Sequence, residues 1–134
     1  MKYLLDTDTC IALLRGHEQA VGRAKKVVPD DLAISSVTRY ELRYGALRCS
    51  GKRRGQESRK VTLFLDVLHE IPFTEDTAEG AAEIRYALES LGHPIGPMDI
   101  LIAATAIEAG LTLVTGNQRE FSRVKGLPLE NWIA

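Results

Sequence analysis

Three carboxylic acids in this 134-residue chain stand where they could act together. Asp6 directly follows a short apolar stretch, Glu41 lies within a basic and apolar stretch, and Asp99 opens an apolar stretch at 100–107. Clustered carboxylates repel one another, and a bound divalent cation relieves that repulsion. Such a cation can generate a hydroxide nucleophile from water and stabilise charge on an attacked phosphate. The three acids therefore predict a site for metal-dependent chemistry.

Asp6 and Glu41 each have a purely structural explanation as well. Asp6 could be a helix cap or a turn residue. Thr38-x-x-Glu41 could be a capping box, in which Glu41 would serve only to satisfy the start of a helix. If Ser36 caps that helix instead, Glu41 lies deeper than the first turn and must point at another partner.

Asp99 lies at the predicted start of a buried helix, two residues after Pro97, which suits the first helical position. A carboxylate in the first turn interacts favourably with the helix dipole, so Asp99 could be present for stability alone. However, Asp99 shares its helix face with Ile102, Ala103 and Ala106 and should therefore project inward. An inward acid near other acids needs a proton or a cation, which favours the metal site.

The available ligands predict Mg²⁺, or Mn²⁺, rather than zinc, because they are oxygen atoms. The three histidines have no zinc-ligand spacing to another His or Cys. Other polar residues could join the site, although turn or capping roles would also explain them. These additional candidates are Asp8, Thr115, Asn117 and Glu120.

Short apolar runs alternate with helical periodicities along the chain. We expect strands at residues 2–5, 32–34, 71–73, 111–115 and 127–129, with Pro72 placing the third at a sheet edge. We expect helices at residues 10–14, 18–28, 36–49, 56–69, 77–91 and 98–109, the first capped by Asp8 or Thr9. This alternation predicts an α/β fold with a mostly parallel central sheet of four to five strands flanked by helices. Ligands bind outside the carboxyl ends of such strands, where the polar candidates fall.

The composition fits one domain over residues 1–134, with 45% hydrophobic and 26% charged residues. Cys10 and Cys49 have no metal-binding or redox spacing, so we expect them to be reduced and the protein to be cytoplasmic. An acid at position 6 argues against a signal peptide. No apolar run approaches the ~18 residues of a membrane span.

Basic residues gather between Arg39 and Lys60, although the net charge of the chain is −1. Eight basic side chains face two acidic ones there, an excess of six positive charges. Such a stretch can attract a polyanion. A solvated, flexible connection is the alternative, because Ser50-Gly51 and Gly55 weaken a helix.

Several segments, in order along essentially the whole chain, match one known family. They are Leu4-Leu5-Asp6-Thr7-Asp8, then 34–42 (ISSVTRYEL), 96–104 (GPMDILIAA), 113–117 (LVTGN) with Glu120-Phe121, and Leu129-Glu130-Asn131-Trp132. In these segments the chain resembles the PIN-domain ribonucleases of the VapC type, toxins of type II toxin–antitoxin systems.

The resemblance implies a PIN-like fold and an Mg²⁺-dependent endoribonuclease that cleaves RNA phosphodiester bonds with metal-activated water. It implies Asp6, Glu41 and Asp99 as catalytic and metal-binding residues. A fourth position, acidic in many PIN domains, falls on Asn117, so Glu120 could contribute instead and Asp8 could lie in the outer shell. The resemblance also implies a cognate antitoxin of the VapB type and a homodimer. The residues expected to bind the RNA backbone are Arg48, Lys52, Arg53, Arg54, Arg59 and Lys60.

Two alternatives remain open at this stage. Asp6-Thr7-Asp8-Thr9 fits the first motif of haloacid-dehalogenase-like phosphatases, in which Asp6 would be a covalent nucleophile. A phosphoacceptor receiver domain would use Asp6 as a switch rather than in catalysis. A phosphatase of this kind normally needs a pair of acids after a strand late in the chain, and a receiver domain needs a lysine after such a strand. The late strand here ends in Thr115-Gly116-Asn117 and has neither. Both predict a phosphate adduct on Asp6.

Overall fold

A computed structural model describes all residues from Met1 to Ala134. Its centre is one sheet of five parallel strands in the order β3-β2-β1-β4-β5. The strands are β1 (Tyr3–Leu5), β2 (Leu32–Ser35), β3 (His69–Ile71), β4 (Thr112–Val114) and β5 (Leu129–Glu130). The predicted α/β fold with a mostly parallel sheet is confirmed, and so is the edge position of the strand beside Pro72.

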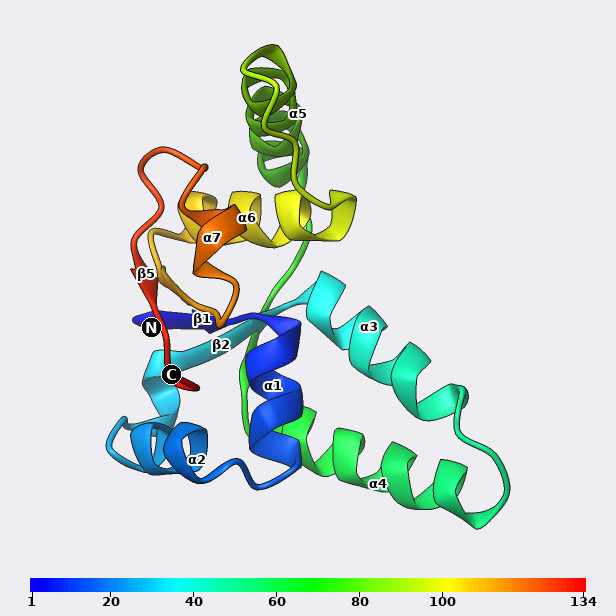
Figure 1. Cartoon of the computed structure of the whole chain (residues 1–134). Helices are drawn as coiled ribbons and strands as arrows, with labels where there is room; N and C mark the ends of the chain where they lie inside the picture. Colours follow the sequence, from blue (N-terminus) through cyan, green and yellow to red (C-terminus); the bar gives the residue numbers. More distant parts are fainter.

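Helices cover both faces of the sheet (Figure 1). The face below the sheet in this view carries α1 (Thr7–Leu14), α2 (Glu18–Lys25), α3 (Ser36–Leu47) and α4 (Lys52–Asp66). The face above it carries α6 (Pro97–Ala109) and the short α7 (Gln118–Phe121), with α5 (Glu75–Ser90) packed on the outside of α6. A 3₁₀ turn, η1 (Pro29–Asp31), leads into β2.

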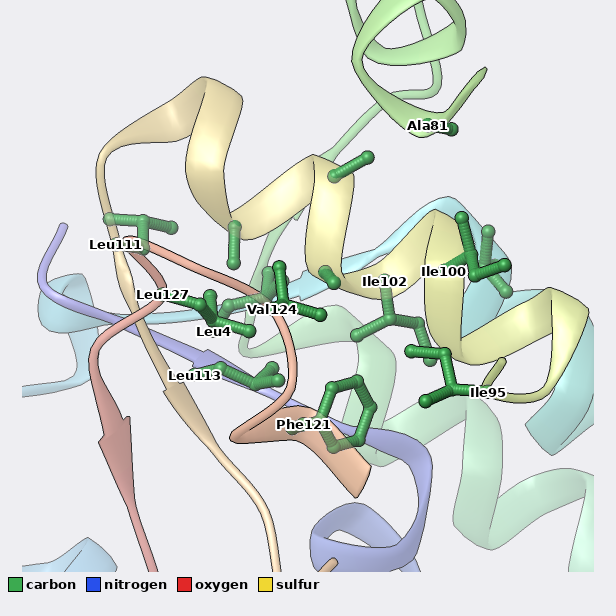
Figure 2. Close-up of a cluster of buried hydrophobic side chains, with 14 of the residues drawn as sticks. Leu4, Ala81, Ile95, Ile100, Ile102, Leu111, Leu113, Phe121, Val124 and Leu127 are labelled. Atoms are coloured by element: carbon green, nitrogen blue, oxygen red, sulfur yellow. The ribbon is translucent and has the colours of Figure 1, made fainter. Parts of the chain in front are cut away.

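Successive side chains of a strand point to opposite faces of the sheet, so they contribute alternately to two hydrophobic clusters. Leu4 lies in the cluster between the sheet and α6, whereas its neighbours Tyr3 and Leu5 lie in the cluster between the sheet and α1, α3 and α4. Figure 2 shows the first cluster, in which Phe121 and Ile102 pack over the sheet. Because α6 is covered by the sheet on one side and by α5 on the other, its nearly continuous apolar sequence is explained.

Several predicted helix boundaries were wrong, because neighbouring polar residues compete for the same cap. Asp6, rather than Asp8 or Thr9, caps α1 by accepting a hydrogen bond from the Thr9 N–H. Ser35, rather than Ser36 or Thr38, caps α3. The capping box of Thr38 and Glu41 does not form, so Glu41 lies beyond the first turn of α3.

Other differences concern the lengths of elements. Helix α4 begins at Lys52, so most of the basic stretch is helical rather than a flexible connection. Strand β3 ends before Pro72, α5 begins at Glu75 after its cap Thr74, and α7 was not predicted. No helix is both long enough and apolar enough to span a membrane.

Candidate active site

Asp6 is buried at the carboxyl end of the central strand β1. Its Oδ1 accepts the Thr9 N–H at 2.8 Å, so this carboxylate serves both as helix cap and as a candidate ligand. Burial raises the pKa of the Asp6 carboxyl above its usual value, and hydrogen bonds from Thr115 and Thr9 oppose that rise. The neighbouring Asp8 is exposed in the first turn of α1 and adds a further repulsive charge.

Glu41 projects from α3 toward the start of α1. Its Oε1 accepts a hydrogen bond of 2.5 Å from the Thr7 hydroxyl, and the Thr7 oxygen lies 3.1 Å from the Thr38 hydroxyl. Thr7 directly follows Asp6 in the chain, so this contact brings two of the three predicted acids to neighbouring positions. Glu41 thus contacts a partner outside its own helix start, although the cap that places it beyond the first turn is Ser35 and not Ser36.

Asp99 is half-buried in the first turn of α6, where Pro97 occupies a first-turn position as expected. Burial and four surrounding carboxylates raise the pKa of Asp99 to about 6. Those carboxylates, in order of effect, belong to Glu120, Asp6, Glu41 and Asp8. The structure therefore gathers all the predicted acids into one region of negative potential at the carboxyl edge of the sheet.

The segment after β4 adds polar groups to this region. Buried Thr115 accepts the Asn117 N–H on its Oγ1 at 2.9 Å, which fixes the turn into α7. Asn117 Nδ2 donates to Glu120 Oε2 at 3.0 Å. Because Glu120 exerts the largest electrostatic effect on Asp99, it is the acid of this segment that faces the other carboxylates.

No basic side chain forms an ion pair with these acids, because every ion pair of the protein lies elsewhere. The oxygen-only donors and the absence of a direct basic partner fit a hard divalent cation. No three acidic, histidine or cysteine side chains are close enough together to form a ready-made ligand set, so a cation would have to draw the carboxylates together.

An open groove of about 830 Å³ runs between α1, α3 and α4 and reaches Glu41. Its floor is apolar, with Leu42 and Val61 among the lining residues. Its cationic lining residues are Arg15, Arg48, Arg53 and Lys60. The structure thus divides the predicted RNA-binding set: Arg48, Arg53 and Lys60 line the groove, whereas Lys52, Arg54 and Arg59 do not.

Three polar residues of this region were not identified from sequence. Thr7 and Thr38 resemble ordinary helix-start residues, and only the spacing of Thr38 three residues before Glu41 hinted at a shared helix face. Arg15 lies at the end of α1, far in sequence from the basic stretch that it joins in the groove.

Comparisons with known proteins agree with this geometry. A family model described as the PIN domain matches residues 3–127. The chain is 37% identical to ribonuclease VapC2 of Rickettsia felis and 33% identical to a tRNA(fMet)-specific endonuclease VapC of Salmonella typhimurium, covering 98% of each chain in both cases. A crystal structure of DNA-bound VapBC from Salmonella typhimurium superposes with a TM-score of 0.91 at 34% identity, again with 98% of each chain covered.

Neither the phosphatase nor the receiver alternative finds support in these matches. The parallel order of strands, the acids at their carboxyl ends and the full-length similarity agree with one another. This chain belongs to the PIN-domain family, among the VapC ribonucleases.

Proposed function

We propose that this protein is a divalent-cation-dependent endoribonuclease that acts as the toxin of a toxin–antitoxin pair in the cytoplasm. The observation that carries the proposal is the group of acids around Asp99, none of which forms an ion pair and which raise the pKa of Asp99 to about 6. Asp6, Glu41 and Asp99 would hold the cation, with Mg²⁺ or Mn²⁺ as the ion. When bound, the cation would activate a water molecule and offset negative charge on the attacked phosphate.

The residues of the chain have separate tasks in this proposal. The carboxylates supply oxygen ligands, and burial of Asp6 keeps its side chain fixed as the cap of α1. The four cationic side chains of the groove would hold the RNA backbone beside the acids, because a carboxylate cluster by itself repels phosphate.

The test is an RNA cleavage assay with purified protein in Mg²⁺, in Mn²⁺ and in EDTA. Because a Salmonella relative is a tRNA(fMet)-specific endonuclease, initiator tRNA is one substrate and an unstructured RNA is the comparison. We expect cleavage that requires the cation and is lost in Asp6→Asn. Cation-independent cleavage, or a stable phosphate adduct on Asp6, would contradict the proposal.

We also propose a VapB-type antitoxin as partner, because similar folds occur in solved VapBC complexes. A second copy of this chain is the other proposed partner. The outer face of α3 exposes Tyr40, Tyr44 and Leu47, which lie at helical spacing and together form an apolar stripe. Light scattering after size-exclusion chromatography should give the mass of a homodimer; a monomer at every concentration would exclude it.

A further inference from the structure

We propose that Ser35, Thr38 and Thr7 form a one-way chain of hydroxyl hydrogen bonds that orients the Glu41 carboxylate. All three are positioning residues in this proposal, because they act through Glu41 and not on the RNA. The proposal rests on the proposed function, since it requires Glu41 to bind the cation.

The chain is continuous in the structure. Ser35 Oγ donates to Thr38 Oγ1 at 3.3 Å, the Thr38 and Thr7 hydroxyl oxygens lie 3.1 Å apart, and Thr7 Oγ1 donates to Glu41 Oε1. Ser35 and Thr38 are completely buried, with side chains 1% and 0% exposed. The hydroxyl groups of Ser35 and Thr38 therefore have no water to replace these partners, whereas Thr7 is half-buried at the end of the chain next to Glu41.

The direction of every hydrogen bond follows from proton counting. A hydroxyl group has one proton to donate, and an ionised carboxylate can only accept. Because Thr7 donates to Glu41, it can only accept from Thr38. Thr38 then uses its own proton on Thr7 and must accept from Ser35. Ser35 Oγ also accepts the Thr38 N–H at 3.1 Å, so the chain is anchored in the cap of α3.

This arrangement ties Glu41 to the element that carries Asp6. Thr7 begins α1 directly after Asp6, whereas Thr38 and Glu41 belong to α3. With Oε1 held by Thr7, Oε2 makes no hydrogen bond within the protein and is available to a cation. Without the chain, Glu41 would populate several rotamers, and a cation would have to order it on binding. Groups that orient ligands in this way typically change metal affinity by about 10- to 100-fold.

A control exists at the start of α5, where a similar pair of hydroxyls occurs on a different helix from Glu41. Thr77 stands at the third position of α5 and its hydroxyl lies 3.1 Å from that of the cap Thr74, as Thr38 stands relative to Ser35. Thr77 is also buried. Thr77→Val therefore measures the structural cost of removing such a hydroxyl, without any effect on Glu41.

The experiment measures Mn²⁺ affinity by calorimetry without RNA, together with the melting temperature without metal. We expect Thr38→Val to weaken Mn²⁺ binding about tenfold, Thr38→Ser to restore it, and Thr77→Val to lower only the melting temperature. Thr7→Val, at a half-buried site, gives the same readout if Thr38→Val does not fold. In a Glu41→Gln background, Thr38→Val should cause no further loss of affinity.

Unchanged Mn²⁺ affinity in both Thr38→Val and Thr7→Val would overturn the proposed chain. Equal losses with and without Glu41 would also overturn it, because the chain acts only through that carboxylate. Asp6→Asn separates this failure from failure of the metal site itself. If Asp6→Asn abolishes Mn²⁺ binding while the threonine variants do not change it, the site stands and the positioning chain does not.

Discussion

Asn117 and Glu120 are joined by a hydrogen bond of 3.0 Å from the Asn117 side-chain amide to Glu120 Oε2. Glu120 is also the charge with the largest effect on Asp99. The resemblance implies a fourth acidic position at Asn117, which is an amide here, and the next acid along the chain is Glu120. We therefore expect Glu120 to contribute the fourth carboxylate and Asn117 to orient it.

The first prediction follows from this pair. Glu120→Gln should weaken Mg²⁺ binding about tenfold, and Asn117→Ala should weaken it only while Glu120 is present. Calorimetric Mg²⁺ titrations of the single and double variants measure both effects. Glu108→Gln, an exposed acid near the end of α6, is the control and should change nothing. Tighter binding in Asn117→Asp, with no effect of Glu120→Gln, would instead make residue 117 the ligand.

A second prediction concerns Asp6→Asn. The asparagine side-chain oxygen can still accept the Thr9 N–H and cap α1, so the fold should remain intact. Removing a buried charge among like charges should raise the melting temperature of the metal-free protein. RNA cleavage should fall by more than about a hundredfold, because a direct ligand matters more than the residues around it. Asp8→Asn removes the same charge at an exposed site and should retain most cleavage.

The third prediction is a pH dependence of stability in EDTA. The Asp99 carboxyl keeps its proton up to pH of about 6 in the folded protein, whereas its pKa in the unfolded chain is near 3.8. Between these values the folded state binds more protons, so the free energy of unfolding falls as pH rises and stays reduced above about 6. Urea unfolding from pH 4 to 7.5 measures this slope.

Asp99→Asn should flatten that slope. At pH 7 it should stabilise the metal-free protein by about 1 kcal/mol, a value that allows for solvent screening of a half-exposed group. Mg²⁺ should stabilise the wild type at pH 7 more than the variant, because it binds the folded state through Asp99. A variant with the wild-type slope would show that Asp99 does not titrate in this range.

The sequence predicted the elements that carry the acids better than the contacts between them. Apolar runs ending at Asp6 and Thr115 located β1 and β4, because buried parallel strands need continuous hydrophobic side chains. Pro97, the first residue of α6, and Gly110, directly after its last residue, bounded that helix correctly. The caps of α1 and α3 were assigned to the wrong residues, because neighbouring Ser, Thr and Asp side chains satisfy the same orphan N–H groups equally well.

The sequence could not predict contacts between residues that lie far apart along the chain. The hydrogen bond from Thr7 to Glu41 joins residues 34 positions apart, and no local pattern encodes it. Similarly, Arg15 enters the groove only because α1 packs beside α3 and α4. Such contacts depend on how the helices pack on the sheet, which propensity and periodicity do not determine.

A fourth prediction concerns the antitoxin. The acid cluster has no basic partner within the chain, so an inhibitor should supply one, and arginine can pair with carboxylates through two hydrogen bonds. Expression of this chain alone should arrest growth, and co-expression with a cognate antitoxin should restore it. Replacing the inserted arginine of the antitoxin by Gln should weaken the complex. Normal growth with abundant soluble wild-type protein would contradict the toxin function.

The last prediction distinguishes two halves of the basic stretch. Arg53 and Lys60 line the groove that reaches Glu41, together with Arg48, whereas Arg54 donates its Nε–H to the Cys49 carbonyl and does not line the groove. If the groove holds the RNA backbone, three groove cations should contribute to binding and three others nearby should not. The groove variant is Arg48→Gln, Arg53→Gln and Lys60→Gln; the control is Lys52→Gln, Arg54→Gln and Arg59→Gln.

Both triple variants remove three positive charges, so a difference between them cannot come from net charge. Each phosphate contact on single-stranded RNA contributes about −0.7 to the slope of log affinity against log salt. The groove variant should therefore have a slope shallower by roughly 2, and the control variant should keep the wild-type slope. Salt titrations in the Asp6→Asn background measure this without cleavage of the RNA. Weakening should be similar for all RNA sequences, because phosphate contacts carry no base information. Equal slopes in the two variants would show that the groove does not bind the RNA backbone, and would assign it to contact with the antitoxin instead.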